Sequence, residues 1–572
     1  MEGKVVSSSK YVMNQQKVRY EWNEIPWRKL EQSSFKLQKR IYQASKCNDV
    51  KRMHNLQRLL LKSTSARMLA VRRVTQDNRG RKTAGIDGKA SLKQKERLQL
   101  ANSLNIREKA KPSRRVWIPK PVKPTEYRPL GIPTIADRAK QTLVKMALEP
   151  EWEAKFEPNT YGFRPGRSCH DSIRAIFDAL KRKMAFVLDA DISGCFDNID
   201  HKVLLEKLHT TPTIVKIIRG WLKAGIMEGK VFQFTKQGTI QGGTISPLLA
   251  NIALHGMECY IKKALANELF SDKKKRLGKA SHRDAQNSCK VIFYADDFII
   301  LHESEEIILR AKTLVEEWLK TIGLELKHSK TKVSHTLKPY GEQKPGFDFL
   351  GFTIRQYPIK RGRKDYKLLI KPSRNSIKQH GLVIKHKLKA LRNAPQETVI
   401  KQLNLIIRGW SQYYTPAVSS KVFGSLDNDT HKKLWKWAVF RHHNKGKSWI
   451  KRKYFKKYGN DNWRFMLNDN LYLIKHKDHA IKWHIKVSGD RSPYDGDWIY
   501  WANRSRRVPG KSPRVIKLLK LQRGKCNCCQ LYFRSDDVIE VHHKDKNRNN
   551  NNIANLSMLH GHCHDYLHKK CA

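Results

Sequence analysis

Two adjacent carboxylates, Asp296 and Asp297, lie between two apolar runs, residues 291–293 and 298–301. Two acids flanked by apolar stretches predict a tight β-hairpin with both acids at its tip. Carboxylates held side by side repel each other, so such a tip is most favourable when a cation shares it. Oxygen ligands suit Mg²⁺, and Mg²⁺ acting on phosphate is polymerase or nuclease chemistry. For these residues alone, a solvated turn is the alternative.

A third carboxylate strengthens the metal interpretation. Residues 185–192 are mostly apolar and end in acids, which predicts a strand, and residues 193–197 predict a break and a helix start. A strand that brings Asp191 beside the hairpin makes a three-acid site, enough to hold two metal ions about 4 Å apart for in-line attack on a phosphate. Asp189 is the alternative ligand, but Asp191 is preferred because it lies nearer the end of the strand.

Cysteines and histidines gather near the C-terminus in two short-spaced pairs. Two such pairs joined by a longer loop predict a tetrahedral structural Zn²⁺ site. The predicted ligands are Cys526, Cys529, His560 and Cys563. Cys528 and His562 are nearby substitutes, so the exact ligand set stays open at this point. Clustering with histidines favours metal binding over disulfides.

Further histidines surround these pairs. His564 and His568 are one helical turn apart, so both can face one cation. A neutral imidazole can bind a metal or take a proton from water. We assign His542 and His564, with His568 beside them, to a catalytic divalent cation. His543 is predicted to be the general base, with Asn555 orienting it.

The composition points to a polyanionic partner. The chain has 572 residues, with 114 Lys and Arg against 52 acids and a formal net charge of +62. Such a surplus is self-repelling unless nucleic acid neutralises it. A membrane partner is not expected, because no apolar run approaches the roughly 20 residues that span a bilayer. The N-terminus is polar and lacks the apolar core of a secretory signal.

The elements that must position these residues follow from the pattern. Residues 22–73 have helical spacing. Residues 114–120 and 128–133 predict two short strands of a hairpin that carries Lys120 and Arg128, suited to gripping a triphosphate. Strands interleaved with helices over residues 110–355 predict an α/β domain.

The character changes after residue 370. Eight of the fourteen tryptophans lie between residues 410 and 501, interleaved with basic residues. This pattern fits RNA binding, or a helical bundle with a Trp-rich core and a solvated basic face. We expect most of these tryptophans to lie in the core. Residues 505–512 predict a linker.

With these residues in place, the chain resembles bacterial and organellar group II intron-encoded proteins, and its pattern is most similar to their cyanobacterial and chloroplast-like branch. The resemblance runs from about residue 22 to residue 568. It rests on residues 84–88, 128–133, 161–165, 190–199, 241–243, 294–297, 346–351 and 408–410.

The resemblance implies a multidomain α+β and α fold class: a right-hand polymerase of fingers, palm and thumb, a helical maturase/thumb domain, and a C-terminal zinc-bound ββα-metal HNH module. The implied divisions are an N-terminal extension and start of the fingers (1–95), fingers and palm (96–360), thumb/maturase domain X (361–455), a DNA-binding segment with linker (456–515), and an HNH endonuclease (516–572).

Residue by residue, the resemblance implies that Asp191, Asp296 and Asp297 hold an Mg²⁺ pair. Phe196 would exclude a ribose 2′-hydroxyl. The residues implied to contact the incoming nucleotide or the template are Lys120, Arg128 and Gln241. The segment 329–332 departs from the family pattern, and which of its lysines, if either, assists the leaving pyrophosphate stays open.

The resemblance implies an RNA-directed DNA polymerase that assists splicing, nicks target DNA and copies intron RNA from the nick. Its partners would be group II intron RNA, target DNA and deoxynucleotide triphosphates. A homodimer stays open, as does location in a bacterial cytoplasm or in a plastid or mitochondrion. The alternatives are a splicing factor without active polymerase and a reverse transcriptase of defence or diversification.

Overall fold

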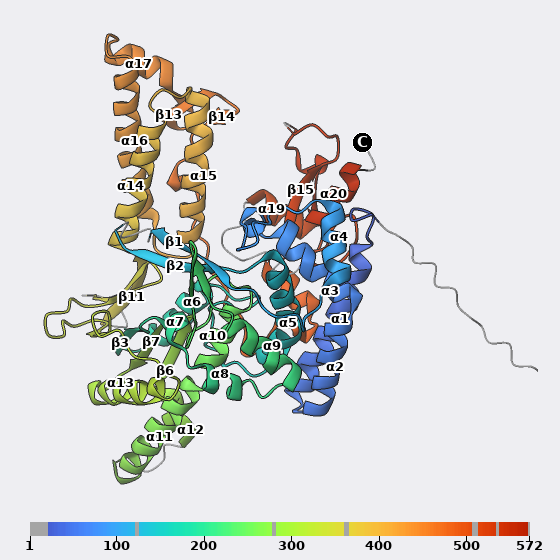
Figure 1. Cartoon of the computed structure of the whole chain (residues 1–572). Helices are drawn as coiled ribbons and strands as arrows, with labels where there is room; N and C mark the ends of the chain where they lie inside the picture. The colour runs from blue at the N-terminus through green and yellow to red at the C-terminus, as the bar shows by residue number, and fades with distance from the viewer. Residues whose placement is uncertain are drawn as a thin grey trace, which may run out of the picture.

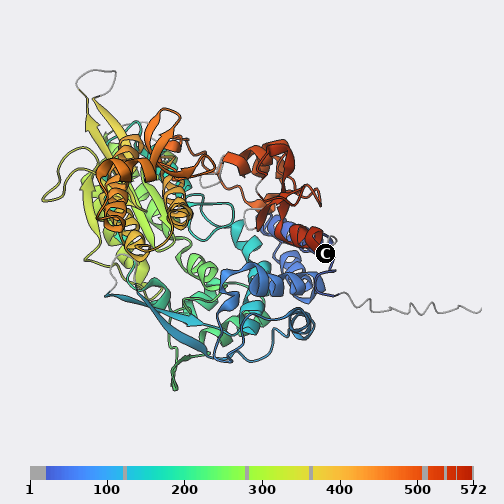
Figure 2. The same cartoon turned by 90° about the horizontal axis from the view of Figure 1, so that it is seen from above.

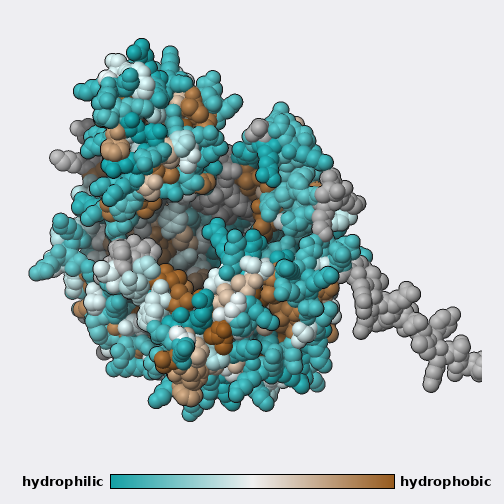
Figure 3. Space-filling model, turned by 45° about the horizontal axis from the view of Figure 1, so that its top comes forward, coloured by the Kyte–Doolittle hydropathy of each residue, from teal (hydrophilic) through white to brown (hydrophobic). Residues whose placement is uncertain are grey.

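The computed structural model describes residues 21–119, 125–276, 282–359, 365–505, 513–533, 537–548 and 550–569. The N-terminal helices form one side of the molecule, and a helical lobe formed by α14–α17 rises on the other (Figure 1). The C-terminal module lies beside the N-terminal helices in both views (Figures 1 and 2). The surface is largely hydrophilic and is hollowed between the helical lobe and the C-terminal module (Figure 3). No helix of the described residues is long and apolar enough to cross a membrane.

The expected N-terminal helices are confirmed. The elements are α1 (Trp27–Lys46), α2 (Val50–Lys62), α3 (Thr64–Arg72), the π-helical turn η1 (Arg73–Asp77), the 3₁₀ turn η2 (Arg79–Lys82) and α4 (Gln94–Ser103). Asp49 and Ser63 accept backbone N–H bonds at the starts of α2 and α3, which fixes where each helix begins. The buried faces of α1, α2 and α3 pack on α5 (Ile135–Glu153).

The acidic hairpin is also confirmed. β6 (Lys290–Tyr294) and β7 (Asp297–His302) pair antiparallel, with Tyr294 opposite Asp297. β3 (Phe186–Asp191) joins β7, and β8 (Lys332–His335) joins β3. The apolar runs are continuous because both faces of the sheet are buried: Leu188 and Ile300 lie in one core cluster and Val187 and Ile299 in the other.

Helices surround this sheet. They are α6 (Cys169–Leu180), α7 (Cys195–Asn198), α8 (His201–Lys207), α9 (Pro212–Leu222), α10 (Ser246–Leu254), α11 (Met257–Arg276), α12 (His282–Ser288) and α13 (Glu305–Lys320). α13 contacts β3 and β7, and α6 contacts β6.

A second sheet contains the predicted finger strands. Its order is β2 (Tyr127–Ile132), β1 (Ser113–Pro119), β4 (Ile226–Glu228) and β5 (Val231–Gln233). β1 and β2 pair antiparallel up to Pro119 opposite Tyr127, so the two predicted strands are confirmed. Lys120 lies outside the described residues.

The helical lobe follows a small sheet of β9 (Phe347–Phe349), β10 (Phe352–Pro358) and β11 (Tyr366–Pro372). The lobe contains α14 (Arg374–Ala390), α15 (Gln396–Tyr414), α16 (Ser420–Arg441), α17 (Lys447–Tyr454), β12 (Phe455–Tyr458), β13 (Asp461–Asn468) and β14 (Leu471–Tyr472). Its core includes Leu388, Leu403 and Ile407.

Most of the tryptophans of residues 410–501 whose side chains the structure describes are buried or pack against a core, as expected: Trp410, Trp435 and Trp449 are partly buried against the core clusters. Of those whose side chains the structure describes, Trp437 and Trp501 are buried, whereas Trp463 and Trp483 are 41% and 61% exposed. Basic side chains cover some of these rings: Lys451 Nζ lies 4.5 Å from the centroid of the Trp463 ring. Such cation–π contacts allow a ring to remain at the surface.

Residues beyond the lobe return to the central sheet domain. The turn η3 (His476–Asp478) still packs on α16, and the return segment after it contains η4 (Pro493–Asp495) and α18 (Trp498–Ser505). The fully buried Asp171 of α6 accepts bonds from His484 Nε2 (3.1 Å), Val487 N (2.8 Å) and an Arg504 N–H (2.6 Å). Burial alone would raise the pKa of Asp171, but His484 and Arg504 together hold it below its ordinary value.

The C-terminal module consists of α19 (Pro513–Leu521), β15 (Ile539–His543), the turn η5 (Ile553–Asn555), β16 (Leu556–His560) and α20 (Gly561–Lys569). β15 and β16 pair antiparallel, with His543 opposite Leu556. Its core contains Leu519, Leu556 and Met558 together with three cysteines. A β-hairpin followed by a helix is therefore built around the metal-ligand pairs.

Candidate functional sites

The three predicted acids meet at one end of the central sheet. Asp191 on β3 lies directly opposite Asp297 on β7, and Asp296 occupies the turn just before β7. Partial burial and then the negative charges of Asp296 and Asp191 raise the pKa of Asp297 to about 6. Partial burial and then Asp191 also raise the pKa of Asp296. The acids are therefore crowded enough to disfavour three negative charges together.

A lysine lies against this acidic site. Lys330 Nζ forms an ion pair with an oxygen of Asp191. Lys332 instead lies on β8 opposite Asp189. Of the two lysines that the sequence left open, Lys330 is the one that reaches the acids. Asp189 shares the face of β3 with Asp191 because side chains alternate along a strand, and partial burial and then Asp297 raise its pKa to about 7.

The carboxylate oxygens of the three acids suit Mg²⁺, although the three acids are not close enough to form a compact ligand group. Among the described residues, the groups of three or more potential ligands whose atoms all lie within 4.8 Å of one another are both in the C-terminal module. The acidic site offers hard carboxylate oxygens whose mutual repulsion a divalent cation would relieve.

The predicted nucleotide-side residues lie around these acids. Phe196 is half-buried in α7 and packs edge-to-face on Phe163, with ring centroids 6.0 Å apart. Arg128 on β2 is exposed, and its charge lowers the pKa of Asp296 and Asp297. These residues surround the space next to the acidic hairpin.

A glycine-rich turn places Gln241 near this group. Its backbone carbonyl accepts a bond from Gly131 N (2.7 Å), and its side chain lies 3.5 Å from an oxygen of Asp197. Gly242 follows with a φ of +120° and its backbone against Gly131. A side chain at residue 242 would be strained and would collide with β2.

Sequence reasoning missed the support beneath the hairpin. Tyr161 N donates to Phe293 O (3.0 Å), so the loop of residues 161–168 packs against β6. A Cβ atom on Gly162 would lie 2.2 Å from the backbone nitrogen of Ala295. Gly162 therefore permits a close approach of two backbones directly behind Asp296. The run Tyr161-Gly162-Phe163 was visible in the sequence, but its partner was not.

The predicted zinc ligands come together. The ligand atoms of Cys526, Cys529, His560 and Cys563 all lie within 4.8 Å of one another, and the four residues are buried. Three thiols and an imidazole at this spacing fit Zn²⁺. The two substitutes do not join them: Cys528 is exposed, and His562 Nδ1 faces Glu31 at 3.5 Å.

The structure also gathers His542, His564 and His568, whose ligand atoms lie within 4.8 Å of one another. Glu540 Oε2 contacts His564 Nδ1 at 2.9 Å. His543 follows His542 on β15, so its side chain points to the other face of the strand. Its Nε2 atom is buried without a hydrogen-bond partner.

Asn555 lies against the turn that follows His543. Its carbonyl oxygen accepts from Lys544 N (2.9 Å), its side-chain oxygen accepts from Asp545 N (3.0 Å), and its amide donates to Asp545 Oδ1 (2.8 Å). In the described residues, Asn555 therefore holds the backbone after His543, and its hydrogen bonds do not reach the imidazole that it was predicted to orient.

Three known protein families match consecutive parts of the chain. Residues 22–104 match the N-terminal domain of reverse transcriptase, residues 118–354 match reverse transcriptase (RNA-dependent DNA polymerase), and residues 382–455 match the group II intron maturase-specific domain. These matched ranges contain the three acids and most of the helical lobe, and they end before the C-terminal module.

Individual proteins are also similar in sequence to this chain. Protein YkfC of Escherichia coli (strain K12) is 31% identical over 331 residues, which is 52% of this chain and 83% of that protein. Group II intron-encoded protein LtrA of Lactococcus lactis subsp. cremoris is 32% identical over 292 residues, 43% of this chain and 47% of LtrA. Maturase-like protein 1 of Euglena gracilis is 26% identical over 409 residues, 68% and 76% of the two chains. The match thus spans about half of LtrA.

Proposed function

Because this chain belongs to the family of group II intron-encoded proteins with reverse transcriptase and maturase domains, we propose that it copies intron RNA into DNA at a target strand that it nicks itself. The observation that carries the polymerase part is the meeting of Asp191, Asp296 and Asp297 at one sheet end. Mg²⁺ held there would activate a primer 3′-hydroxyl and neutralise the leaving pyrophosphate.

The chain's own residues supply the positioning. Lys330 offsets the charge of Asp191, and Arg128 adds positive charge facing the other two acids. Phe196, held by Phe163, is suited to lie under the sugar of the nucleotide and to disfavour a 2′-hydroxyl. Lys120 and Gln241 complete the proposed contacts to nucleotide or template. Positioning and charge stabilisation are the main protein contributions in this chemistry.

The C-terminal module is proposed to be an HNH endonuclease of the ββα-metal type, as in the cyanobacterial and chloroplast-like branch. Its support is the order β15, β16, α20 with two separate groups of metal ligands. Zn²⁺ on the cysteine-rich group would be structural, and a divalent cation on His542, His564 and His568 would act in cleavage. His543, which follows His542 on β15, is the proposed general base.

The remaining assignments are proposals as well. The maturase domain of residues 361–455 would bind the intron RNA for splicing together with the strands that complete the helical lobe, and the rest of residues 456–515 would contact target DNA. The chain would act in a bacterial cytoplasm or an organelle, alone or as a homodimer. A splicing-only protein and a non-intron reverse transcriptase are the rivals, and a group II ribozyme sequence flanking the reading frame would exclude the second.

One experiment with two variants tests the assignment. Asp296→Ala combined with Asp297→Ala should lower primer extension on an RNA template at least about a hundredfold. Without these carboxylates the site would lose the Mg²⁺ that stabilises charge at the reacting phosphate. RNA binding and target nicking should remain. His543→Ala should abolish nicking and spare primer extension, so each variant is the control for the other. Primer extension that survives the double change, or nicking that survives His543→Ala, contradicts the corresponding site.

A further inference from the structure

A buried arginine organises one end of the N-terminal helices. Arg72, the last residue of α3, is 4% exposed. Its guanidinium lies 3.4 Å from Glu31 of α1, 3.6 Å from Asp77 of η1 and 4.8 Å from the centroid of the Trp27 ring. A buried charge needs such partners, so Glu31 and Asp77 are held in place at the surface of the helical body.

The π-helical turn η1 presents Gln76 next to this group. The Gln76 side-chain oxygen accepts from Trp22 Nε1 (3.0 Å) and from an Arg97 N–H (3.4 Å). Both bonds use the oxygen, so the amide nitrogen is directed outward. It donates to Asp565 Oδ2 of the C-terminal module at 2.9 Å. Single π-helical turns inside helices often mark functional positions.

α20 of the C-terminal module meets this surface with one face. His562 lies 3.5 Å from Glu31 and is 8% exposed, and Asp565 follows three residues later on the same helix face. His564 and His568 point instead toward His542 on β15. His564 is half-buried and His568 is exposed, so this contact leaves the proposed cleavage site open to DNA.

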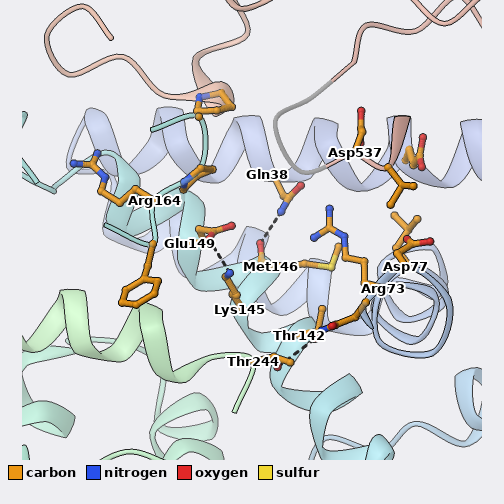
Figure 4. A pocket seen from close by; sticks show the side chains of 18 of the residues that line it. Gln38, Arg73, Asp77, Thr142, Lys145, Met146, Glu149, Arg164, Thr244 and Asp537 are labelled. Atoms are coloured by element: carbon orange, nitrogen blue, oxygen red, sulfur yellow. Dashed lines mark hydrogen bonds and ion pairs between the residues drawn. The ribbon is translucent and has the colours of Figure 1, made fainter. Parts of the chain in front are cut away.

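A cavity of about 820 Å³ lies beside the contact and is lined by both bodies. Figure 4 shows Gln38, Arg73 and Asp77 of the N-terminal helices and Asp537 of the C-terminal module around it. The two bodies are therefore not tightly packed along this contact. The cavity is also lined by Phe163, whose loop supports the acidic hairpin.

We propose that Glu31, Arg72, Gln76 and Asp77 form a docking platform for α20 of the C-terminal module. Docking fixes the His542 cluster relative to the three acids while leaving the cluster accessible. A DNA end released at the cluster then starts from a fixed position relative to the polymerase site. This coupling role rests on the proposed function, whereas the docking itself does not.

Docking is tested by cross-linking in the zinc-loaded full chain. Gln76→Cys with Asp565→Cys should be joined by a short bismaleimide, with the 76–565 peptide identified by mass spectrometry. Adding Glu31→Lys should lower that yield at least about fivefold, because a lysine there repels Arg72 and removes the carboxylate that faces His562. Gln32→Lys introduces the same side chain at the exposed neighbouring residue and should leave the yield unchanged. Absence of the 76–565 peptide, or equal yields in both lysine variants, overturns the docking platform.

Coupling is tested with the same charge variants and native cysteines. Nicking of target DNA, and extension of a primer already annealed to RNA, should stay within about twofold in Glu31→Lys and Gln32→Lys. The yield of cDNA that starts at the nick should fall about tenfold in Glu31→Lys alone. Equal cDNA yields overturn the coupling role. If neither variant nor the parent chain nicks DNA, the proposed endonuclease fails, while the cross-link still reports docking.

Discussion

At the scale of single residues, the acidic site combines repulsion with local neutralisation. Asp191 and Asp297 are opposite each other, Asp296 is adjacent, and only some of their charge is offset by Lys330. The pKa of Asp297 is raised to about 6, although its side chain keeps contact with solvent. A carboxyl with a raised pKa holds its proton to higher pH, so protons and Mg²⁺ compete for this residue near neutrality.

This competition predicts a pH-dependent need for Mg²⁺. Below about pH 6 Asp297 is protonated, so the Mg²⁺ concentration for half-maximal primer extension should rise as the pH falls from 7.5 to 5.5. Lys330 lowers the pKa of both Asp296 and Asp297, so Lys330→Met should shift the rise to higher pH. Titrating Mg²⁺ at a series of pH values checks this, with the surface variant Lys181→Met as control. A Mg²⁺ requirement independent of pH would count against Asp297 as a ligand.

At the scale of elements, the sequence predicted secondary structure correctly where the paired segments are neighbours along the chain. The hairpin of β6 and β7 follows from two apolar runs and a two-residue turn, and the paired strands β1 and β2 were equally local. Ligand pairs such as Cys526 and Cys529 were visible because metal geometry restricts their spacing.

Contacts between distant segments were not predictable in the same way. Asp171 gives no sign in the sequence that it anchors Arg504, more than three hundred residues away. Gly162 shows a close approach only once Ala295 is placed beside it. The ring of Trp463 lies at the surface with Lys451 over it. Amphipathic spacing in the sequence does not distinguish such a surface ring from a buried one.

The proposed zinc site of the C-terminal module leads to a prediction at this same scale. Cys526, Cys529 and Cys563 occupy its small core, where unbound thiols would replace part of a hydrophobic centre. Zinc binding and folding are coupled in modules of this size, so a chelator should unfold residues 513–569 and undock α20, while primer extension persists. Hydrogen exchange of the full chain checks this. Cys529→Ser should mimic the chelator, and the exposed Cys528→Ser should retain zinc. Protection that survives zinc removal would show that the module folds without metal.

At the scale of the whole molecule, the net charge of +62 dominates association with nucleic acid. Exposed basic residues of the helical lobe accompany aromatic rings: Lys451 lies over the exposed Trp463, and Lys453 Nζ lies 4.7 Å from the centroid of the half-buried Trp449 ring. Phosphate contacts by lysine release counterions, whereas stacked rings contribute affinity that depends little on salt. The two terms can therefore be separated by a salt titration.

Binding of the chain to its intron RNA should weaken at least about a thousandfold between 50 and 200 mM salt. Lys451→Gln with Lys453→Gln should make the slope of log affinity against log salt shallower by about 1.4, which corresponds to two lost contacts to single-stranded RNA at about 0.7 each. Trp463→Ala should lower affinity at every salt concentration and leave the slope unchanged. Lys401→Gln is the matched control, because that lysine is already paired with Glu397. Filter binding over a salt series measures both quantities, and an unchanged slope in the double variant would place the RNA on another face of the lobe.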